Sequence, residues 1–244
     1  MMTSVAAPGA WAAAQKLDYA SLSSAVPDVQ ESGIAQANPD IEEQLFGGAN
    51  KPAGEALKAL ELNVNIEGPR KIVPVENFDD AGLHPVVREN IRRCGYASPT
   101  AIQGYCIPAL LAENDIVAVA QTGSGKTAAY MIPIVSRLMG KVDKIGGPRV
   151  DTTAYDYNPD RDRVRAEPLV VIVCPTRELA HQIFQEARRI SYRSKLLPVC
   201  VYGGLPLSFN VQQLSKGCDI LIGTPGRLGS LMDKPHLLSM SRVK

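Results

Sequence analysis

The sequence predicts an α/β fold in which a parallel sheet carries helices on both faces, preceded by a largely disordered, low-complexity tail. Two observations predict the domain: short apolar runs alternate with helical segments from residue 75 onward, and a glycine-rich loop follows the first of those runs. Strands that alternate with helices form parallel sheets with both faces covered. A third observation predicts the tail, because residues 1–74 are rich in Ala, Ser, Gly, Pro and acidic residues and contain no long periodic segment.

The predicted elements follow an order set by apolar runs and by Gly and Pro. A helix over residues 85–94 is closed by Gly95, and Ser98-Pro99 begins a second helix that reaches Pro108. Short apolar runs predict four buried strands, at 115–120, 169–173, 199–202 and 219–222. The main helices between and after them are predicted at 128–138, 178–190 and 206–214. Residues 140–167 are polar and rich in Gly, Pro and Asp, which predicts a surface insertion, and the tail predicts one short helix over 55–62.

Charge is divided unevenly along the chain. Residues 1–75 hold 5 Lys and Arg against 9 Asp and Glu, a net charge of −4, and residues 76–244 hold 21 against 16, a net charge of +5. The basic bias of the second part is compatible with a nucleic-acid partner. The five cysteines include no C-x-x-C pair, and no apolar stretch approaches ~18 residues. We therefore expect a protein of a reducing compartment, cytoplasmic or also nuclear, with no zinc site, no membrane partner and no secretory signal.

The loop after the first predicted strand has the spacing of a phosphate-binding loop. Ala120 and the run Gly125-Lys126-Thr127 satisfy A/G-x-x-x-x-G-K-[ST]. Gly123 and Gly125 allow the backbone to curl so that successive N–H groups converge on a polyphosphate. Lys126 is predicted to reach the β- and γ-phosphates and the Thr127 hydroxyl to ligate Mg²⁺. The following helix points its positive end at the same anion, so the sequence predicts a nucleoside triphosphate site with Mg²⁺.

Three further segments follow the other predicted strands. Each places small residues, hydroxyls or an Arg at the start of a helix, so that free N–H groups face outward from one edge of the sheet. Such a row can hold the phosphates of an extended polynucleotide without reading its bases. The predicted contact residues are Pro175, Thr176, Arg177, Gly203, Gly204, Thr224, Pro225, Gly226 and Arg227.

In this order the motifs resemble those of the DEAD-box RNA helicases, over about residues 74–231. Gly95–Gln103 is similar to the family's Q motif, Ala120–Thr127 to motif I, Pro175–Ala180 to motif Ia and Thr224–Leu228 to motif Ib. The residues Ser191-Tyr-Arg-Ser194, Val201–Gly204 and the lead-in Phe78…Gly82-Leu83 resemble the Vasa-like branch. The resemblance implies a RecA-like domain that uses ATP and Mg²⁺ and binds RNA, single-stranded or duplex, through its phosphate backbone.

The resemblance also implies roles for individual residues. Gln103 would read the edge of the adenine with its amide, which can donate and accept in one plane. Phe78 would stack on the base, and Tyr96 of the Q motif would belong to the same ATP site. In the loop itself, the ATP contacts would be Gln121, Thr122, Gly123, Ser124, Gly125, Lys126 and Thr127, of which Lys126 and Thr127 would be catalytic. Two departures from the family pattern, Ala101 and Glu113-Asn114, are expected to change only a helix entry and a turn.

A larger departure is that no acidic pair follows an apolar strand in residues 205–244. The resemblance implies an Asp-Glu-Ala-Asp motif after motif Ib, whose carboxylates hold Mg²⁺ and orient the attacking water. Two hypotheses therefore stay open. The chain is the front part of an ATP-dependent RNA helicase that does not turn over ATP by itself, or it is a non-catalytic nucleotide- and RNA-binding module that competes with an intact helicase.

Overall fold

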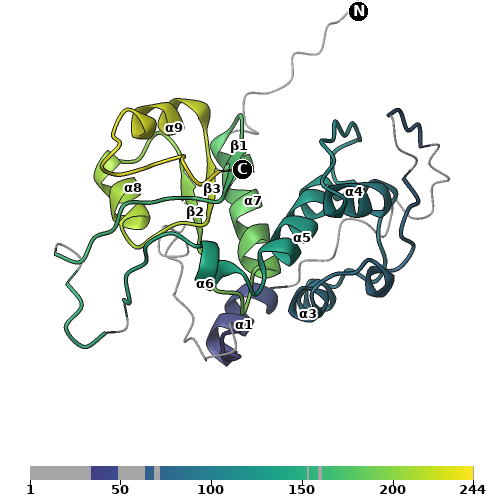
Figure 1. Ribbon diagram of the computed structural model, residues 1–244, viewed down its shortest axis with the longest axis horizontal. Helices are drawn as coiled ribbons and strands as arrows, with labels where there is room; N and C mark the ends of the chain where they lie inside the picture. The colour runs from purple at the N-terminus through teal and green to yellow at the C-terminus, as the bar shows by residue number, and fades with distance from the viewer. Residues whose placement is uncertain (1–33, 49–63, 69–71, 153, 159–160, 244) are drawn as a thin grey trace, which may run out of the picture.

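The computed structural model describes residues 34–48, 64–68, 72–152, 154–158 and 161–243. Within these residues a parallel sheet has the strand order β1–β3–β2 (Figure 1). The strands are β1 (Val170–Val173), β2 (Pro198–Val201) and β3 (Ile220–Gly223), and Ile220 is in register with both Val170 and Pro198. The predictions of strands at 169–173, 199–202 and 219–222 are confirmed to within one residue at each end.

Helices cover both faces of this sheet. On one face, Ile220 and Ile222 of β3 pack in the same core as Phe184 of α7 (Arg177–Ile190). On the other face, Leu221 packs with residues of α8 (Leu207–Leu214) and α9 (Pro225–Met232), among them Leu214 and Leu231. Neighbouring residues of a strand point to opposite faces, so an apolar strand needs this double covering. The predicted fold class, a parallel sheet with helices on both faces, is confirmed.

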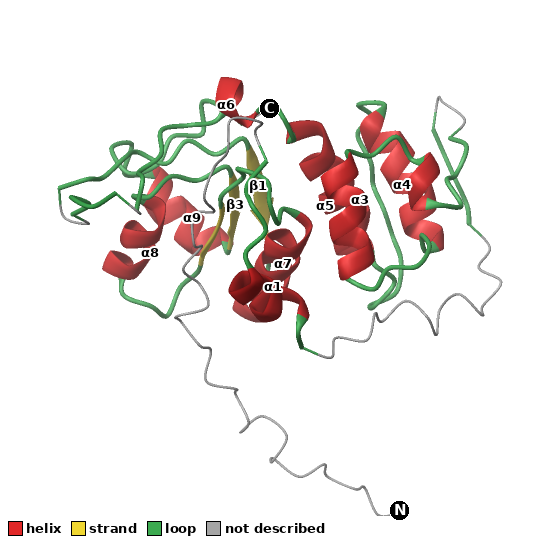
Figure 2. Ribbon diagram, turned by 90° about the horizontal axis from the view of Figure 1, so that it is seen from below, coloured by secondary structure: helices red, strands yellow, loops and turns green. Residues whose placement is uncertain are grey.

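A second group of elements, which we call the helical half, precedes the sheet in the chain. It contains the short helix η2 (Phe78–Asp80), α3 (Pro85–Arg93), α4 (Ala101–Leu111) and α5 (Lys126–Leu138). Figures 1 and 2 show α7 between the helical half and the sheet. The predicted helix over 85–94 is confirmed, but α4 begins at a capping box of Thr100 and Gln103 rather than at Ser98 and runs past Pro108 to Leu111.

The prediction of a buried strand at residues 115–120 is wrong. No strand lies between α4 and α5 in the structure, and the side chains of Val117 and Val119 are 96% and 93% exposed. A strand exists only where its N–H and C=O groups meet a neighbouring strand. Among the described residues, β1 pairs with β3 alone, and the apolar run 115–120 pairs with no strand. Composition therefore predicted the apolar character of this segment correctly and its pairing wrongly.

Part of the segment predicted to be disordered is a docked helix. Asn38 caps α1 (Pro39–Phe46) by accepting from the N–H groups of Asp40 and Ile41, and Leu45 is 5% exposed. Glu42 pairs with Arg93 of α3, and the Nε of Arg189 on α7 donates to the carbonyl of Leu45 over 2.9 Å. The prediction of a disordered tail over 1–74 therefore does not hold for residues 34–48. The predicted helix over 55–62 lies outside the described residues.

The predicted insertion at 140–167 carries a short helix, α6 (Val142–Ile145), and is fixed at its two ends. Arg149 binds both carboxylate oxygens of Asp219 over 2.7 and 2.8 Å, and Asp219 directly precedes β3. At the other end, Ala166 is fully buried and bridges to Leu238. Between the two ends the side chain of Tyr155 is fully exposed. In the described part of the chain no helix has the length and apolar character that crossing a membrane needs.

Candidate functional site

The glycine-rich loop forms a tight bend between the exposed segment 115–120 and α5. Gly123 and Gly125 have φ angles of 80° and 88°, in the left-handed region that glycine adopts without strain. A Cβ on Gly125 would lie 2.4 Å from Nε2 of Gln103, so no other residue fits there without displacing that side chain. The ammonium of Lys126 donates to the carbonyls of Ala120 at 2.5 Å and Gln121 at 2.7 Å. The lysine therefore lies inside the bend, and its contact with the β- and γ-phosphates stays a prediction.

Several features of this bend suit a polyphosphate. It stands at the N-terminus of α5, where backbone N–H groups of the first turn have no partner within the helix. Ser124 is 7% exposed, and its hydroxyl is buried without a hydrogen-bond partner among the described residues. An anion at the bend would give the Lys126 ammonium a counter-ion. Thr127, in the first turn of α5, supplies the hydroxyl that would hold a phosphate-bound Mg²⁺.

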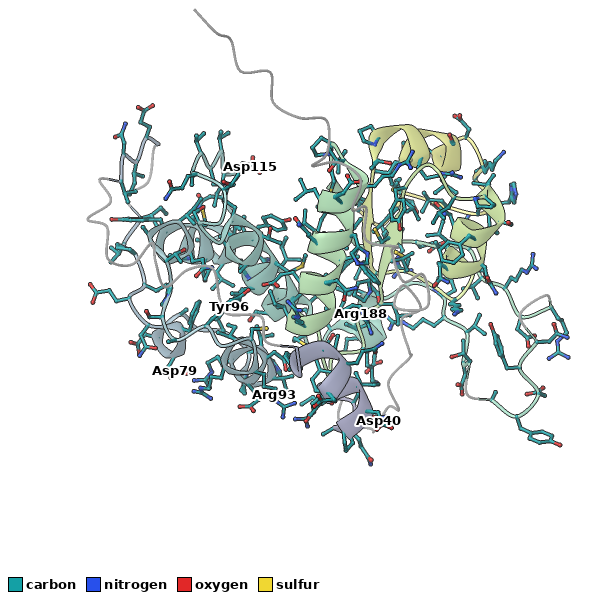
Figure 3. All side chains as sticks on the ribbon, turned by 180° about the vertical axis from the view of Figure 1, so that it is seen from behind. Asp40, Asp79, Arg93, Tyr96, Asp115 and Arg188 are labelled. Carbon is teal, nitrogen blue, oxygen red and sulfur yellow. The ribbon has the colours of Figure 1, made fainter. Side chains whose placement is uncertain are left out.

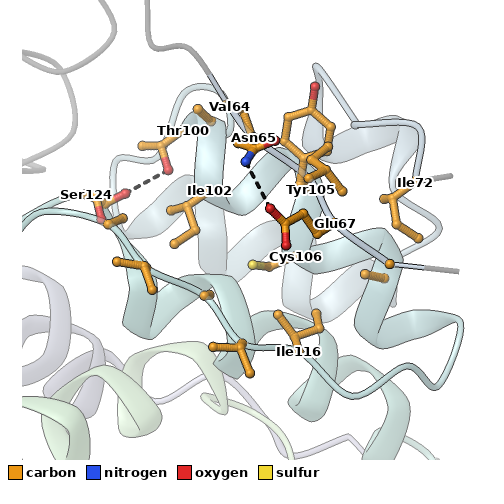
Figure 4. A pocket seen from close by; sticks show the side chains of 18 of the residues that line it. Val64, Asn65, Glu67, Ile72, Thr100, Ile102, Tyr105, Cys106, Ile116 and Ser124 are labelled. Carbon is orange, nitrogen blue, oxygen red and sulfur yellow. Dashed lines mark hydrogen bonds between the residues drawn. The ribbon is translucent and has the colours of Figure 1, made fainter. Parts of the chain in front are cut away.

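Two residues of the predicted adenine-reading motif hold the loop from behind. The hydroxyl of Thr100 donates to the carbonyl of Ser124 over 2.8 Å (Figure 4), and Nε2 of Gln103 donates to the carbonyl of Gly125 over 3.2 Å. Oε1 of Gln103 accepts from the N–H of Thr100 over 3.0 Å. Gln103 is 4% exposed, so in this structure its amide acts as a brace of the loop. Its role in reading adenine stays a prediction.

The other two residues predicted for the adenine site point elsewhere. Phe78 is 5% exposed and packs in the main core with Leu83 and Val87. The hydroxyl of Tyr96 donates to Oε1 of Glu186 on α7 over 2.5 Å. Burial raises the pKa of Tyr96, and the neighbouring negative charge of Glu186 raises it further. The structure does not bring Phe78 or Tyr96 onto the glycine-rich loop, and base stacking by Phe78 stays a prediction.

A cavity of about 1020 Å³ adjoins the loop at Gln121 and Ser124 (Figure 4). One wall is a face of α4 with Ile102, Tyr105 and Cys106, and the opposite wall includes Ile116. Sequence reasoning did not select these residues, because their apolar character is equally typical of a core. Thr100 was also not selected, although its spacing to Gln103 is that of a capping box and was visible in the sequence.

The three strand-exit segments meet at one edge of the sheet, which we call the rim (residues 175–177, 203–204 and 224–227). The N–H of Cys174 donates to the carbonyl of Gly223, and the N–H of Thr224 donates to the carbonyl of Val201, so the three strands end side by side. Most of the predicted contact residues, Pro175, Thr176, Arg177, Gly204, Pro225 and Gly226, are exposed, and Gly203, Thr224 and Arg227 are half-buried. The structure therefore brings all nine predicted residues together.

Two arginines connect the segments of the rim. The guanidinium of Arg177 lies so close to Gly204 that a Cβ there would collide with it. The guanidinium of Arg227 donates to the carbonyl of Leu205 over 2.7 Å. Thr176 caps α7 by accepting from the N–H of Leu179 over 3.3 Å. The rim thus presents cationic side chains beside the N-termini of α7 and α9, a combination suited to phosphate groups.

The chain is similar to known proteins in sequence and in structure. A family model described as DEAD/DEAH box helicase matches residues 100–244. DEAD-box ATP-dependent RNA helicase 52A of Oryza sativa subsp. japonica is 38% identical over 188 residues, which are 77% of this chain and 30% of that protein. Among solved structures, a DEAD box protein from Methanococcus jannaschii is 30% identical with a TM-score of 0.55, covering 70% of this chain and 40% of its own.

The ADP-bound RNA-helicase Prp28 from Chaetomium thermophilum is also similar, at 32% identity and a TM-score of 0.56, covering 70% of this chain and 37% of its own. This chain thus spans about a third of the length of these proteins. The residues that the family model matches, 100–244, include the glycine-rich loop, the brace behind it and the rim. The chain belongs to the DEAD/DEAH box helicase family.

Proposed function

We propose that this chain is the ATP- and RNA-binding front part of a DEAD-box RNA helicase of the Vasa-like branch. The observation that carries the proposal is the position of Lys126, whose ammonium lies within the glycine bend while Thr100 and Gln103 hold that bend from α4. Lys126 and the loop N–H groups would bind the phosphates of ATP, and Thr127 would hold Mg²⁺. The bound Mg²⁺ would neutralise charge on the β- and γ-phosphates.

The rim supplies the second half of the proposal. A strand of RNA laid across it would meet Arg177, Arg227 and the N–H groups at the starts of α7 and α9. These groups recognise phosphate and carry no base code, so binding would be independent of base sequence. In the whole protein, duplex parting driven by ATP would follow from the two sites acting together. Assignment to the Vasa-like branch rests on the residues Ser191–Ser194 and Val201–Gly204.

We expect the 244-residue chain to show no RNA-stimulated ATP hydrolysis. Phosphoryl transfer depends on positioned charge, and residues 205–244 contain no acidic pair behind an apolar strand to hold Mg²⁺ and orient water. The measurement is phosphate release with and without a single-stranded RNA. Turnover that Lys126→Ala abolishes would contradict this expectation, while binding without turnover is also what a non-catalytic competitor of an intact helicase would show.

The rim assignment predicts that Arg177→Ala weakens RNA binding uniformly for all base sequences. Loss of one phosphate contact should lower the slope of log affinity against log salt by about 1. The measurement is a salt titration of oligo(U) and oligo(A) binding by fluorescence anisotropy. Arg92→Ala is the matched control, because Arg92 lies on α3 and pairs with Asp79 over 2.8 Å. An unchanged slope in Arg177→Ala, or a strong preference for one sequence in the unaltered chain, would refute the assignment.

A further inference from the structure

Helix α7 carries a residue of the rim and packs against α5, the helix that begins at the glycine-rich loop. Its first residue is Arg177 of the rim, and its buried side chains Ile183 and Phe184 share one core with Ile132 of α5 and Ile222 of β3. Helix α5 begins at the glycine-rich loop, so this core connects α7 to that loop through α5. A shift of α7 would therefore move residues of the rim and of the helical half together.

A polar contact fixes α7 against the helical half. The Tyr96 hydroxyl donates to Oε1 of Glu186, and Tyr96 lies beside α7 in Figure 3. The Glu186 side chain is only 13% exposed, and its charged partner, Arg189 at 3.8 Å, lies on the same helix. A carboxylate that is nearly buried loses much of its hydration and depends on such donors. The hydrogen bond from the Tyr96 hydroxyl therefore joins Glu186 of α7 to the segment between α3 and α4.

From Tyr96 the chain leads directly to the brace of the loop. Three residues separate Tyr96 from Thr100, and Thr100 and Gln103 bind the carbonyls of Ser124 and Gly125. The charge of Glu186 also acts on Tyr130 of α5. Burial raises the pKa of Tyr130 to about 12, with the Thr127 side chain as a hydrogen-bond partner and the charge of Glu186 as a further neighbour. Glu186, on the helix that begins at the rim, therefore contacts the segment that leads to the brace and lies near Tyr130 of α5.

We propose that Tyr96 and Glu186 are a pair of positioning residues that couple nucleotide at the glycine-rich loop to RNA at the rim. The pair joins α7, whose first turn carries Arg177, to the segment that places Thr100 and Gln103 behind the loop. Occupation of either site then favours the arrangement of α7 that suits the other. This inference rests on the proposed function, and it assigns Tyr96 a role behind the loop instead of contact with the nucleotide.

The experiment measures the affinity of the chain for Mg²⁺ and AMP-PNP, with and without a 20-nucleotide oligo(U). The ratio of the two affinities is the coupling. In the unaltered chain we expect RNA to raise nucleotide affinity about fivefold or more, in the range usual for coupled sites. Tyr96→Phe and Glu186→Ala should each bring the ratio close to one, and the double variant should have no further effect. Glu186→Gln, which keeps an oxygen acceptor for the tyrosine, should retain most of the coupling.

Tyr192→Phe is the matched control. Its hydroxyl also donates to a glutamate, Glu42, over 3.1 Å, and that bond joins α1 rather than the loop segment. A general loss of stability would affect Tyr192→Phe and Tyr96→Phe alike, while loss of coupling should occur only in Tyr96→Phe.

The outcomes separate this inference from the proposed function. No AMP-PNP binding by the unaltered chain would remove the proposed function and the inference with it. Nucleotide binding that RNA does not alter, or that RNA alters equally in all variants, overturns the inference alone. If Tyr96→Phe weakens AMP-PNP binding without RNA and Glu186→Ala does not, Tyr96 contacts the nucleotide directly and the positioning role is wrong.

Discussion

Replacing Lys126 by Ala is expected to abolish the stabilisation of this protein by Mg²⁺ and ATP. The ammonium is the cation inside the glycine bend, where it donates to the carbonyls of Ala120 and Gln121, and under the proposed function a phosphate of ATP would take the place of these acceptors. A ligand at 100 times its Kd stabilises the folded state by about 2.7 kcal/mol. For a chain of this size that corresponds to a rise in Tm of roughly 5 to 10 °C. Lys126→Ala should show almost none of this rise.

The measurement is a thermal unfolding series with increasing Mg²⁺-ATP. Lys144→Ala serves as control, because Lys144 is an exposed lysine on α6, away from the bend, and should keep the full rise. Comparing each variant with its own ligand-free Tm removes the effect of the two hydrogen bonds that Lys126→Ala loses. Equal protection of the unaltered chain and of Lys126→Ala would mean that the nucleotide site lies elsewhere.

Replacing Arg149 by Ala is expected to cost roughly 2 to 4 kcal/mol of unfolding free energy at neutral pH. That variant leaves the Asp219 carboxylate buried without its charged partner, and the Asp219 side chain is only 2% exposed. This expected loss of unfolding free energy is smaller than the loss for a fully buried pair, since the Arg149 side chain is 27% exposed. Arg161→Ala is the control, because the Arg161 side chain is 63% exposed where it pairs with Asp162, and its loss should cost less than 1 kcal/mol, a typical limit for surface pairs.

This prediction has a pH dependence whose sign follows from Asp219. Burial raises the pKa of that carboxyl above its ordinary value, and the Arg149 guanidinium opposes the rise. The Asp219 carboxyl therefore binds a proton more readily in the folded protein than in the unfolded chain. Between its two pKa values, the contribution of this group to the free energy of unfolding falls as pH rises. Without Arg149 the pKa of Asp219 in the folded protein rises further. The loss of unfolding free energy in Arg149→Ala should hence be larger at pH 7 than near pH 5, and urea unfolding at both pH values would test this. A loss of stability that is equal at both pH values, or no larger than that of Arg161→Ala, would show that the Arg149–Asp219 pair does not support the insertion.

The elements predicted well are those in which local signals decide. The strand at β3 is an apolar run bounded by Gly217 and Thr224, and α7 begins at the cap Thr176, shortly after the apolar run 169–173. Their periodicity and caps lie within a few residues of one another, so the sequence alone was sufficient. The same is true of the glycine bend, where the spacing of Gly125, Lys126 and Thr127 is itself the structural requirement.

Long-range pairing explains what was missed. The run 115–120 has strand composition, but its state depends on whether a neighbour supplies a ladder, and that neighbour is remote in sequence. Helix α1 has few residues and weak periodicity, and it is held by Arg93 and Arg189, 51 and 144 residues away from their partners. The bond between Tyr96 and Glu186 spans 90 residues. No pattern within a short window contains such information.

The sequence by itself determined the α/β class, the glycine bend with its lysine and the set of residues that form the rim, because each depends on residue types at short spacing. Tertiary structure alone decided that 115–120 remains unpaired, that residues 39–46 dock as a helix, and that Gln103 and Tyr96 turn toward the loop backbone and toward α7. The physical reason is that hydrogen bonds and ion pairs of buried groups are satisfied by whatever the fold brings near them, and that proximity is a property of the packed chain.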